Sequence, residues 1–300
     1  MSRNVAYLFC RYSISDSRAR ELSLDEQLRA FKALRGVPVV HRKAEPTDND
    51  RDTLICRPKS STVEGYGYII FDVAQEVTGR SVADYDRDAD AIVERWDDGK
   101  HIRYTSFVAI PQLGVVATSD RSGDPHLGAT PAIARLRSVF RNQDKIPGVA
   151  LDIVAAADRV EVKRALTEWA LNRFSFSVRP FNPHPRIPGK KLSEMMKQDQ
   201  IGAVRGVATP TPGGQMSMSS EGYIEEAVGL ADAGYGQYGF DGTTPSGRQA
   251  SLKKPNFSLD KAKNERVQSA PQQIKVSLDP QPSEAEEFKE AARALIEFYG

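Results

Sequence analysis

Asp152, Glu161 and Lys163 are the residues whose types and order most resemble a catalytic set. In metal-dependent nucleases an Asp followed by Glu-x-Lys supplies two carboxylates for magnesium, and the lysine steadies the attacking hydroxide. The same Glu161 also fits the third position of a helix that begins after Asp158, where it would complete a capping box. The sequence therefore leaves a nuclease and a purely structural reading open, and the structural reading is favoured.

Other catalytic signatures are weak. The stretch Gly234–Gly239 reads G-x-G-x-x-G, but a helix is expected before it and a strand after it, which reverses the order of a dinucleotide site. The four histidines (His41, His101, His126, His184) fall in separate segments without metal-ligand spacing. We therefore expect no cofactor and no metal, and an enzyme is the weaker hypothesis.

Cationic residues recur through the middle of the chain. Phosphate contact without base readout requires arginine and lysine on helix faces and loops. A proline-rich stretch, residues 180–188, would hold some of these cations in a stiff arm after a strand. The candidate nucleic-acid contacts are Arg135, Arg137, Lys163, Arg164, Arg179, Arg186, Lys190 and Lys191. The alternative is ordinary solvated surface charge.

The periodicity predicts the elements that would position these residues. A strand at 149–157, a helix at 158–173 and a strand at 174–180 form a central unit, with a hairpin over 101–120 before it. Capped amphipathic helices are expected with Ser23, Thr130 and Ser283 as their N-caps. The pattern predicts an α+β fold of two subdomains: residues 1–208, and a smaller C-terminal region, residues 209–300.

The composition of the chain bears on its binding partners and its compartment. The 300 residues carry a formal net charge of +1, so a generic polyanion binder is not indicated by charge alone. Residues 61–100 hold 4 Lys/Arg against 10 Asp/Glu, and a short acidic helix is expected over residues 88–99. The acidic segment 84–98, or the C-terminal helix, could be a docking face for a protein partner. Cys10 and Cys56 are expected to be reduced, and without a signal peptide or membrane span the chain is expected in the cytoplasm.

The middle segment resembles a known family. Leu113-Gly114 at the hairpin, Leu-Asp-Ile-Val at 151–154, the basic helix, and the exit Asn182-Pro183-x-Pro185 are similar in layout to the DNA-binding sensor of Rex-type phage-exclusion pairs and to related bacterial defence-cluster proteins. The similarity covers about residues 103–188. It implies an α+β homodimer that binds duplex DNA without strong sequence preference and signals to a small membrane-protein partner; no catalytic residues carry over.

The sequence thus favours a non-sequence-specific nucleic-acid-binding sensor or regulator in phage exclusion or antiviral defence. Two alternatives remain: the magnesium nuclease of Asp152, Glu161 and Lys163, and a protein-interaction module without nucleic-acid binding. The sequence does not rank DNA against RNA as the ligand.

Overall fold

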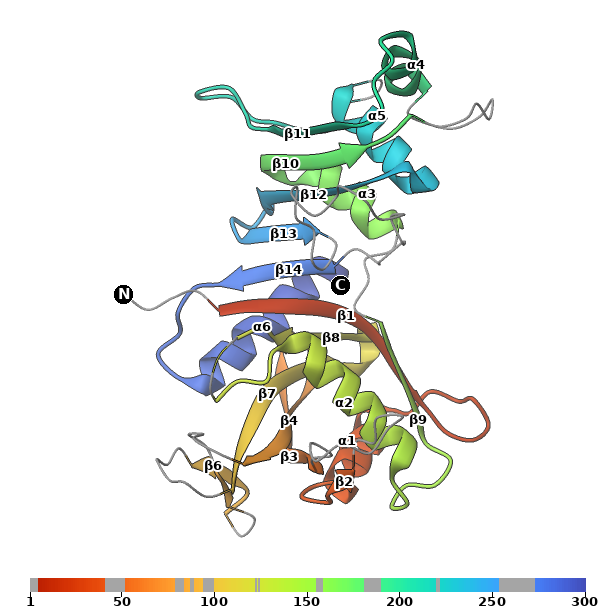
Figure 1. The fold of residues 1–300 in the computed structure, drawn as a ribbon. Coiled ribbons are helices and arrows are strands. Elements are labelled where there is room, and N and C mark those ends of the chain that lie inside the picture. Colours follow the sequence, from red (N-terminus) through yellow and green to blue (C-terminus); the bar gives the residue numbers. More distant parts are fainter. Residues whose placement is uncertain are drawn as a thin grey trace. The chain divides into compact units, whose positions relative to one another are not determined.

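The computed structural model has an α+β fold, as the sequence predicted (Figure 1). It describes residues 5–40, 52–78, 84–86, 89–93, 100–121, 123, 125–154, 159–180, 190–219, 222–253 and 273–300. The chain forms two compact units. Unit 1 comprises residues Met1–Val154 and Leu278–Gly300, and unit 2 comprises residues Ala155–Ser277.

Unit 1 is built on an antiparallel sheet in the order β1-β8-β7-β4-β3-β2, with β9 beside the second half of β1. The strands are β1 (Val5–Ser15), β2 (Val39–Val40), β3 (Asp52–Val63), β4 (Tyr66–Thr78), β7 (Lys100–Ile110), β8 (Val115–Ser119) and β9 (Ala150–Val154). The expected hairpin is β7–β8, joined by the short 3₁₀ turn η1 (Pro111–Leu113). Gly114 ends that turn at φ 63°, in the left-handed region that favours glycine.

Strand alternation gives this sheet two apolar faces. Helices α1 (Leu24–Ala33) and α2 (Ala129–Asn142) cover one face, where Phe31 and Phe71 stack with ring centroids 4.1 Å apart and Phe140 meets Phe31 edge-on. On the other face lies α6 (Glu284–Tyr299), whose Phe298 contacts Phe9 of β1. The predicted N-caps Ser23 and Ser283 both accept a hydrogen bond from the third helical residue.

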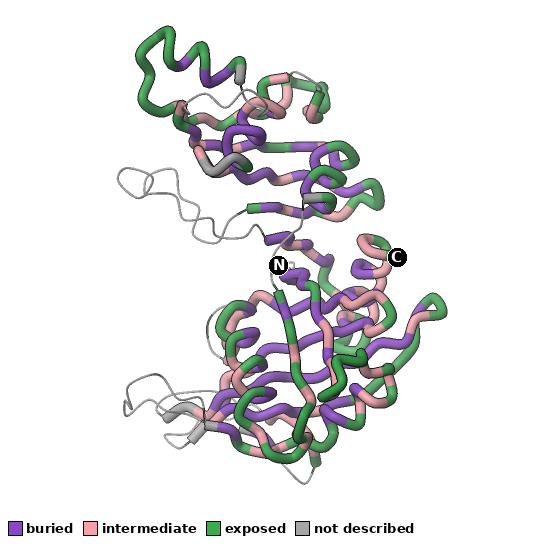
Figure 2. The backbone as a smooth tube through the Cα atoms, turned by 90° about the vertical axis from the view of Figure 1, so that its right-hand side faces the viewer, coloured by how far each residue is buried: buried purple, intermediate pink, exposed green. Residues whose placement is uncertain are grey.

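Unit 2 contains antiparallel strands in the order β11-β10-β12-β13-β14. Its strands are β10 (Ala170–Val178), β11 (Val204–Ala208), β12 (Gly236–Thr243), β13 (Gln249–Lys253) and β14 (Gln273–Leu278). Its helices are α3 (Arg159–Glu168), α4 (Lys190–Gln198), α5 (Tyr223–Leu230) and the π-helical turn η2 (Ala231–Tyr235). Figure 2 shows the buried residues running along the strands of each unit.

Helices pack on one face of the unit 2 sheet. Tyr223 of α5 meets Phe176 edge-on at 5.3 Å, and Trp169, directly after α3, meets Phe240 at 5.5 Å. Figure 1 shows α3 and α5 behind β10 and β12. The alternation predicted for 174–178 is confirmed, because Phe174, Phe176 and Val178 are buried while Ser175 and Ser177 are only partly buried.

Several local expectations differ from the structure. The helix expected over 158–173 ends at Glu168, because β10 begins at Ala170, and the N-cap of α2 is Gly128 rather than Thr130. The helix expected over 88–99 is wrong where the chain is described: Ala91–Val93 is the strand β6, paired with β5 (Asp84–Asp86). Strands β9 and β10 are not neighbours, because β9 pairs with β1 and β10 with β11 and β12. A domain boundary at 208/209 would cut unit 2, because β10, which precedes this boundary, pairs with β12, which follows it.

Candidate functional sites

A β-bulge in unit 1 places Arg57 at the centre of a polar site. The register between β3 and β4 shifts between Cys56 and Lys59, and Arg57 there has φ 50°. Pro58 has no N–H, so it fits a bulge better than a regular ladder position. The Arg57 backbone N–H donates instead to Asp90 Oδ1 at 3.1 Å. Strained backbone held by such side-chain contacts is characteristic of functional positions.

Arg57 reaches a fully buried carboxylate. Its Nε donates to Asp72 at 2.6 Å, Ser106 Oγ donates to the other Asp72 oxygen at 2.6 Å, and both terminal Arg57 nitrogens donate to Glu284 at 2.9 and 3.0 Å. Burial raises the pKa of Asp72, against the attraction of Arg57. Burial also opposes the charge on Arg57, but Asp72 and Glu284 outweigh it and raise the Arg57 pKa.

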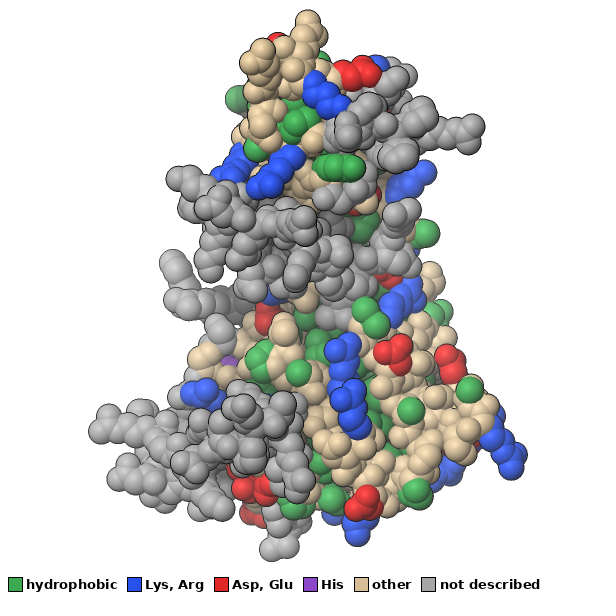
Figure 3. All heavy atoms as spheres, turned by 45° about the vertical axis from the view of Figure 1, so that its right-hand side comes forward, with side chains coloured by type: hydrophobic (Ala, Val, Ile, Leu, Met, Phe, Trp, Pro, Cys, Tyr) green, Lys and Arg blue, Asp and Glu red, His purple; other side chains and the backbone are tan. Residues whose placement is uncertain are grey.

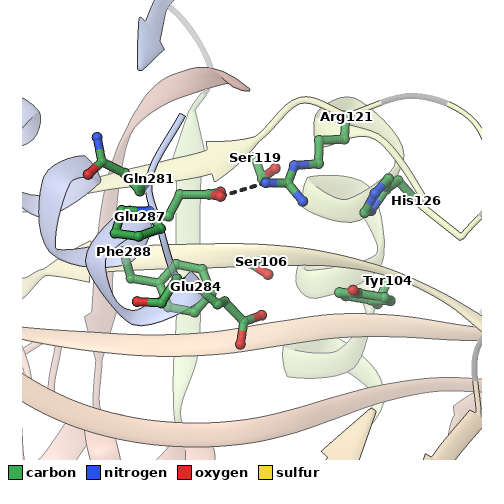
Figure 4. Close-up of a pocket in the computed structure, with 11 residues that line it drawn as sticks. Tyr104, Ser106, Ser119, Arg121, His126, Gln281, Glu284, Glu287 and Phe288 are labelled. Atoms are coloured by element: carbon green, nitrogen blue, oxygen red, sulfur yellow. Dashed lines mark hydrogen bonds and ion pairs between the residues drawn. The ribbon is translucent and has the colours of Figure 1, made fainter. Parts of the chain in front are cut away.

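A pocket of about 290 Å³ lies beside this ion-pair network (Figure 4). Its walls come from β7, from β8 and the segment that follows it, and from the start of α6. Arg121 donates to Glu287 at 2.6 Å, and Tyr7 donates to the other Glu287 oxygen at 2.7 Å. Burial, and then the Glu287 charge, raise the pKa of Tyr7, so this phenol stays a hydrogen-bond donor. The pocket is therefore lined by charged groups held in fixed positions.

A second candidate surface is the face of the unit 2 sheet opposite its helices, which we call the open face. No described helix of unit 2 packs on it. A bulge between Leu171 and Arg173 turns both Asn172 and Arg173 outward, and Arg205 on β11 pairs with Ser177 on the same side. Among the described residues, the open face carries the cations Arg173, Arg205, Lys253 and Lys275 and the carboxylate Asp241, which pairs with Lys253 at 2.9 Å.

The middle of the open face is flat. Ser175, Ser177 and Ser251 are small, and Gly239 stands between two of these strands. A Cβ at Gly239 would lie 2.9 Å from the Lys253 Cβ, so the close strand approach requires glycine there. The Ser175 hydroxyl donates to the Gly239 carbonyl at 3.1 Å. No aromatic side chain projects from the described strands of this face.

The predicted nucleic-acid contacts are divided between the two units. Arg135 and Arg137 lie on α2 of unit 1, where Arg135 donates to Thr53 at 3.3 Å and Arg137 donates to the Ile153 carbonyl. Lys163 and Arg164 are exposed on α3, on the helical side of unit 2, and Arg164 pairs with Glu168.

The other predicted contacts surround the exit from β10. Arg179 is exposed directly after β10, and Lys190 and Lys191 begin α4, where Lys191 is exposed. Arg186 and residues 181–189 of the proline-rich arm lie outside the described residues. In the view of Figure 3 the described Lys and Arg side chains occur singly or in small groups. Their role in binding stays a prediction.

The residues of the nuclease set are also divided between the two units. Asp152 is exposed on β9 of unit 1, while Glu161 is buried in the first turn of α3 in unit 2 and belongs to a helix rather than a strand. Within the described residues no group of three His, Cys, Asp or Glu could hold a metal ion. The glycine stretch has a helix before it and a strand after it, as expected. Of the histidines, His126 borders the pocket; His41 and His184 lie outside the described residues.

Sequence reasoning missed Arg57, Asp72 and the open-face cations Arg205, Lys253 and Lys275. Two signals were present. Pro58 interrupts a strand-like run, which indicates a bulge, and Asp72 stands alone among apolar strand residues, which requires a buried partner. Glu284, which pairs with Arg57, lies 227 residues away from it in sequence, and no local pattern connects the two.

No protein-family model matches this chain, and no curated protein matches it in sequence. In the described part of the chain, no helix is long and apolar enough to cross a membrane. The resemblance to Rex-type sensors stays a prediction.

Proposed function

We propose that this protein binds nucleic acid through the open face of unit 2, by contacts to the phosphate backbone. The observation that carries the proposal is the placement of Arg173, Arg205, Lys253 and Lys275 around a floor of serine and glycine. From β11 to β14 these cations span four strand spacings, roughly 19 Å, which is the axial length of about five to six base pairs.

The chemistry of the face supports non-specific binding. Long cationic side chains reach phosphates, and flat small residues between them let a backbone approach without steric hindrance. Because the open face lacks aromatic rings among its described residues, it offers no stacking platform for unpaired bases. We therefore infer that duplex is bound at least as tightly as single strands.

The resemblance of residues 103–188 to Rex-type sensors gives this binding a biological setting. In that setting the protein is a homodimeric sensor or regulator of phage exclusion in the cytoplasm, and nucleic-acid binding is the input that it passes to a membrane-protein effector. Sedimentation equilibrium tests the dimer, and co-purification from a host that carries the neighbouring genes tests the effector.

The open face is tested by fluorescence anisotropy with labelled duplex, single-stranded DNA and RNA of one sequence. The double variant Arg173→Gln/Arg205→Gln should weaken duplex binding by about tenfold or more, because two phosphate contacts are lost. The matched control is Lys163→Gln/Arg164→Gln, which removes two positive charges from the helical side of the same unit.

Equal affinity of the open-face variant and the parent protein, at the same salt, would refute the proposal. A loss seen only in the α3 variant would assign binding to the helical side instead. Adding magnesium and plasmid to the same preparations tests the nuclease alternative, since cleavage abolished by Glu161→Gln would establish it.

A further inference from the structure

We infer that the pocket of unit 1 binds a small zwitterion of amino-acid size, with its carboxylate at Ser119 and Arg121 and its ammonium at Glu284. A volume of about 290 Å³ lies at the small end of ligand sites and equals the share of about ten waters in the liquid. The inference concerns unit 1 alone and does not rest on nucleic-acid binding by unit 2.

The pocket contains donors that the protein itself leaves available. Ser119 is only 6% exposed and lines the pocket, where its hydroxyl can donate to a ligand oxygen. Arg121 uses one terminal nitrogen for Glu287, and its remaining N–H groups make no hydrogen bond to any described residue. A carboxylate fits this pair, because guanidinium and hydroxyl donors can each bond one of its oxygens.

A fixed anion lies on another wall of the pocket. The Glu284 side chain is 47% exposed, and two hydrogen bonds from Arg57 hold its carboxylate in place. In Figure 4, Arg121 and Glu284 lie on different sides of the cluster, with Ser119 near Arg121. An ammonium group next to Glu284 would therefore sit apart from a carboxylate next to Arg121.

The charges of the pocket favour a zwitterion over a simple ion. Arg57 and Arg121 oppose Asp72, Glu284 and Glu287, which leaves one negative charge in excess when His126 is neutral. A phosphate would meet repulsion from the carboxylates, and a simple amine would offer no acceptor to the Ser119 hydroxyl and to the Arg121 N–H groups that do not bind Glu287. Phe288 supplies an apolar wall for the remainder of a small ligand.

The test is a thermal-shift screen of the full-length protein with each common L-amino acid at about 10 mM, followed by calorimetry of those that raise the midpoint. Acetate and methylamine serve as probes that carry only one of the two charges. We expect at least one amino acid to bind saturably, and both single-charge probes to bind at least tenfold more weakly.

Ser119→Ala and Arg121→Gln should each reduce that affinity at least tenfold, and Glu284→Gln should do the same. Arg293→Gln on α6 is the matched control, because Arg293 pairs with Glu290 outside the pocket lining. Ser119→Ala removes a single oxygen atom, so this variant should fold. It therefore tests the inference even if Glu284→Gln does not fold. The inference is overturned if no amino acid binds, if acetate binds equally well, or if Ser119→Ala and Arg121→Gln leave the affinity unchanged.

Discussion

At the residue scale, the main electrostatic feature is the buried ion pair between Arg57 and Asp72. Asp72 is 1% exposed, and Arg57 is its only cationic partner among the described residues. The Arg57 side chain is itself fixed by Glu284 and by a backbone bulge. Removing either member of such a pair leaves an uncompensated charge in the protein interior.

Arg57→Gln should therefore lower the free energy of unfolding by about 3–5 kcal/mol at pH 7. Burial already raises the pKa of Asp72, and loss of the guanidinium raises it further. A raised acid pKa means that the folded state binds the proton more tightly than the unfolded chain, so stability recovers as pH falls from 7 toward the unfolded pKa of about 3.9. Urea titrations at several pH values measure this.

The double variant Arg57→Gln/Asp72→Asn should regain much of the loss, because the buried charge is gone. If Arg57→Gln is as stable as the parent at pH 7, the pair does not carry the stability assigned to it.

The two cysteines give a second prediction at this scale. Cys10 and Cys56 are not joined in a disulfide and are almost completely buried, and burial raises the pKa of the Cys10 thiol to about 12. Since only thiolates react rapidly with alkylating agents, the native protein should resist iodoacetamide at pH 8, and urea should expose both thiols. Mass spectrometry of timed samples measures the reaction; rapid labelling of native Cys10 would contradict the burial.

At the element scale, α1 shows how a local signal specifies a helix. Ser23 and Glu26 form the capping box that the sequence predicted, and Arg20 donates to both Glu26 oxygens at 2.9 and 3.0 Å. The hydrogen bonds from Arg20 and then those from Ser23 lower the pKa of Glu26 to about 2. This box anchors the start of a helix whose Phe31 stacks on Phe71.

The Ser23–Glu26 capping box should determine part of the fall in the free energy of unfolding at low pH, which we call the acid limb. A lowered carboxyl pKa stabilises the folded state above the unfolded pKa of about 4.3, and that contribution is lost as pH falls toward 2. Glu26→Gln should flatten the pH dependence of unfolding over this window, and Ser23→Ala should cost about 1 kcal/mol at neutral pH. The control is Glu168→Gln, an exposed ion-pair member at the last residue of α3. An unchanged acid limb in Glu26→Gln would show that the box is not formed.

Much of the element list could be predicted from sequence because its signals are local. The capped helices α1 and α6, the β7–β8 hairpin and the alternation of β10 all follow from residues within one turn or one strand. The helix expected over 88–99 is wrong because β5 and β6, which are neighbours in sequence, pair as a hairpin there, and the helical pattern was weak. Asp90, expected on a solvated surface, instead accepts from Tyr85 at 2.6 Å and from the Arg57 amide.

At the scale of the whole molecule, contacts between segments far apart in sequence decide which residues belong to which unit, and composition does not reveal these contacts. Unit 1 takes its last helix, α6, from the C-terminus, and α6 supplies Glu284 and Glu287 to the polar pocket. The pocket could therefore not be predicted from the sequence. The cationic residues could be recognised as a class, but their distribution between two units and two sides of a sheet depends on strand order.

A net charge of +1 makes the open face a local feature rather than part of a positively charged molecule. Binding should then depend on a few direct contacts and not on long-range attraction. Each phosphate contact contributes about −0.9 to the slope of log K against log salt concentration on duplex DNA. Four cations therefore predict a slope of about −3 to −4.

The most direct test of nucleic-acid binding by unit 2 is this salt slope, measured by anisotropy on one duplex for the parent and for Arg173→Gln/Arg205→Gln. The account predicts a parent slope of about −3 to −4 that becomes shallower by about 2 in the variant. A parent slope near zero, or a slope that the variant leaves unchanged, would contradict it.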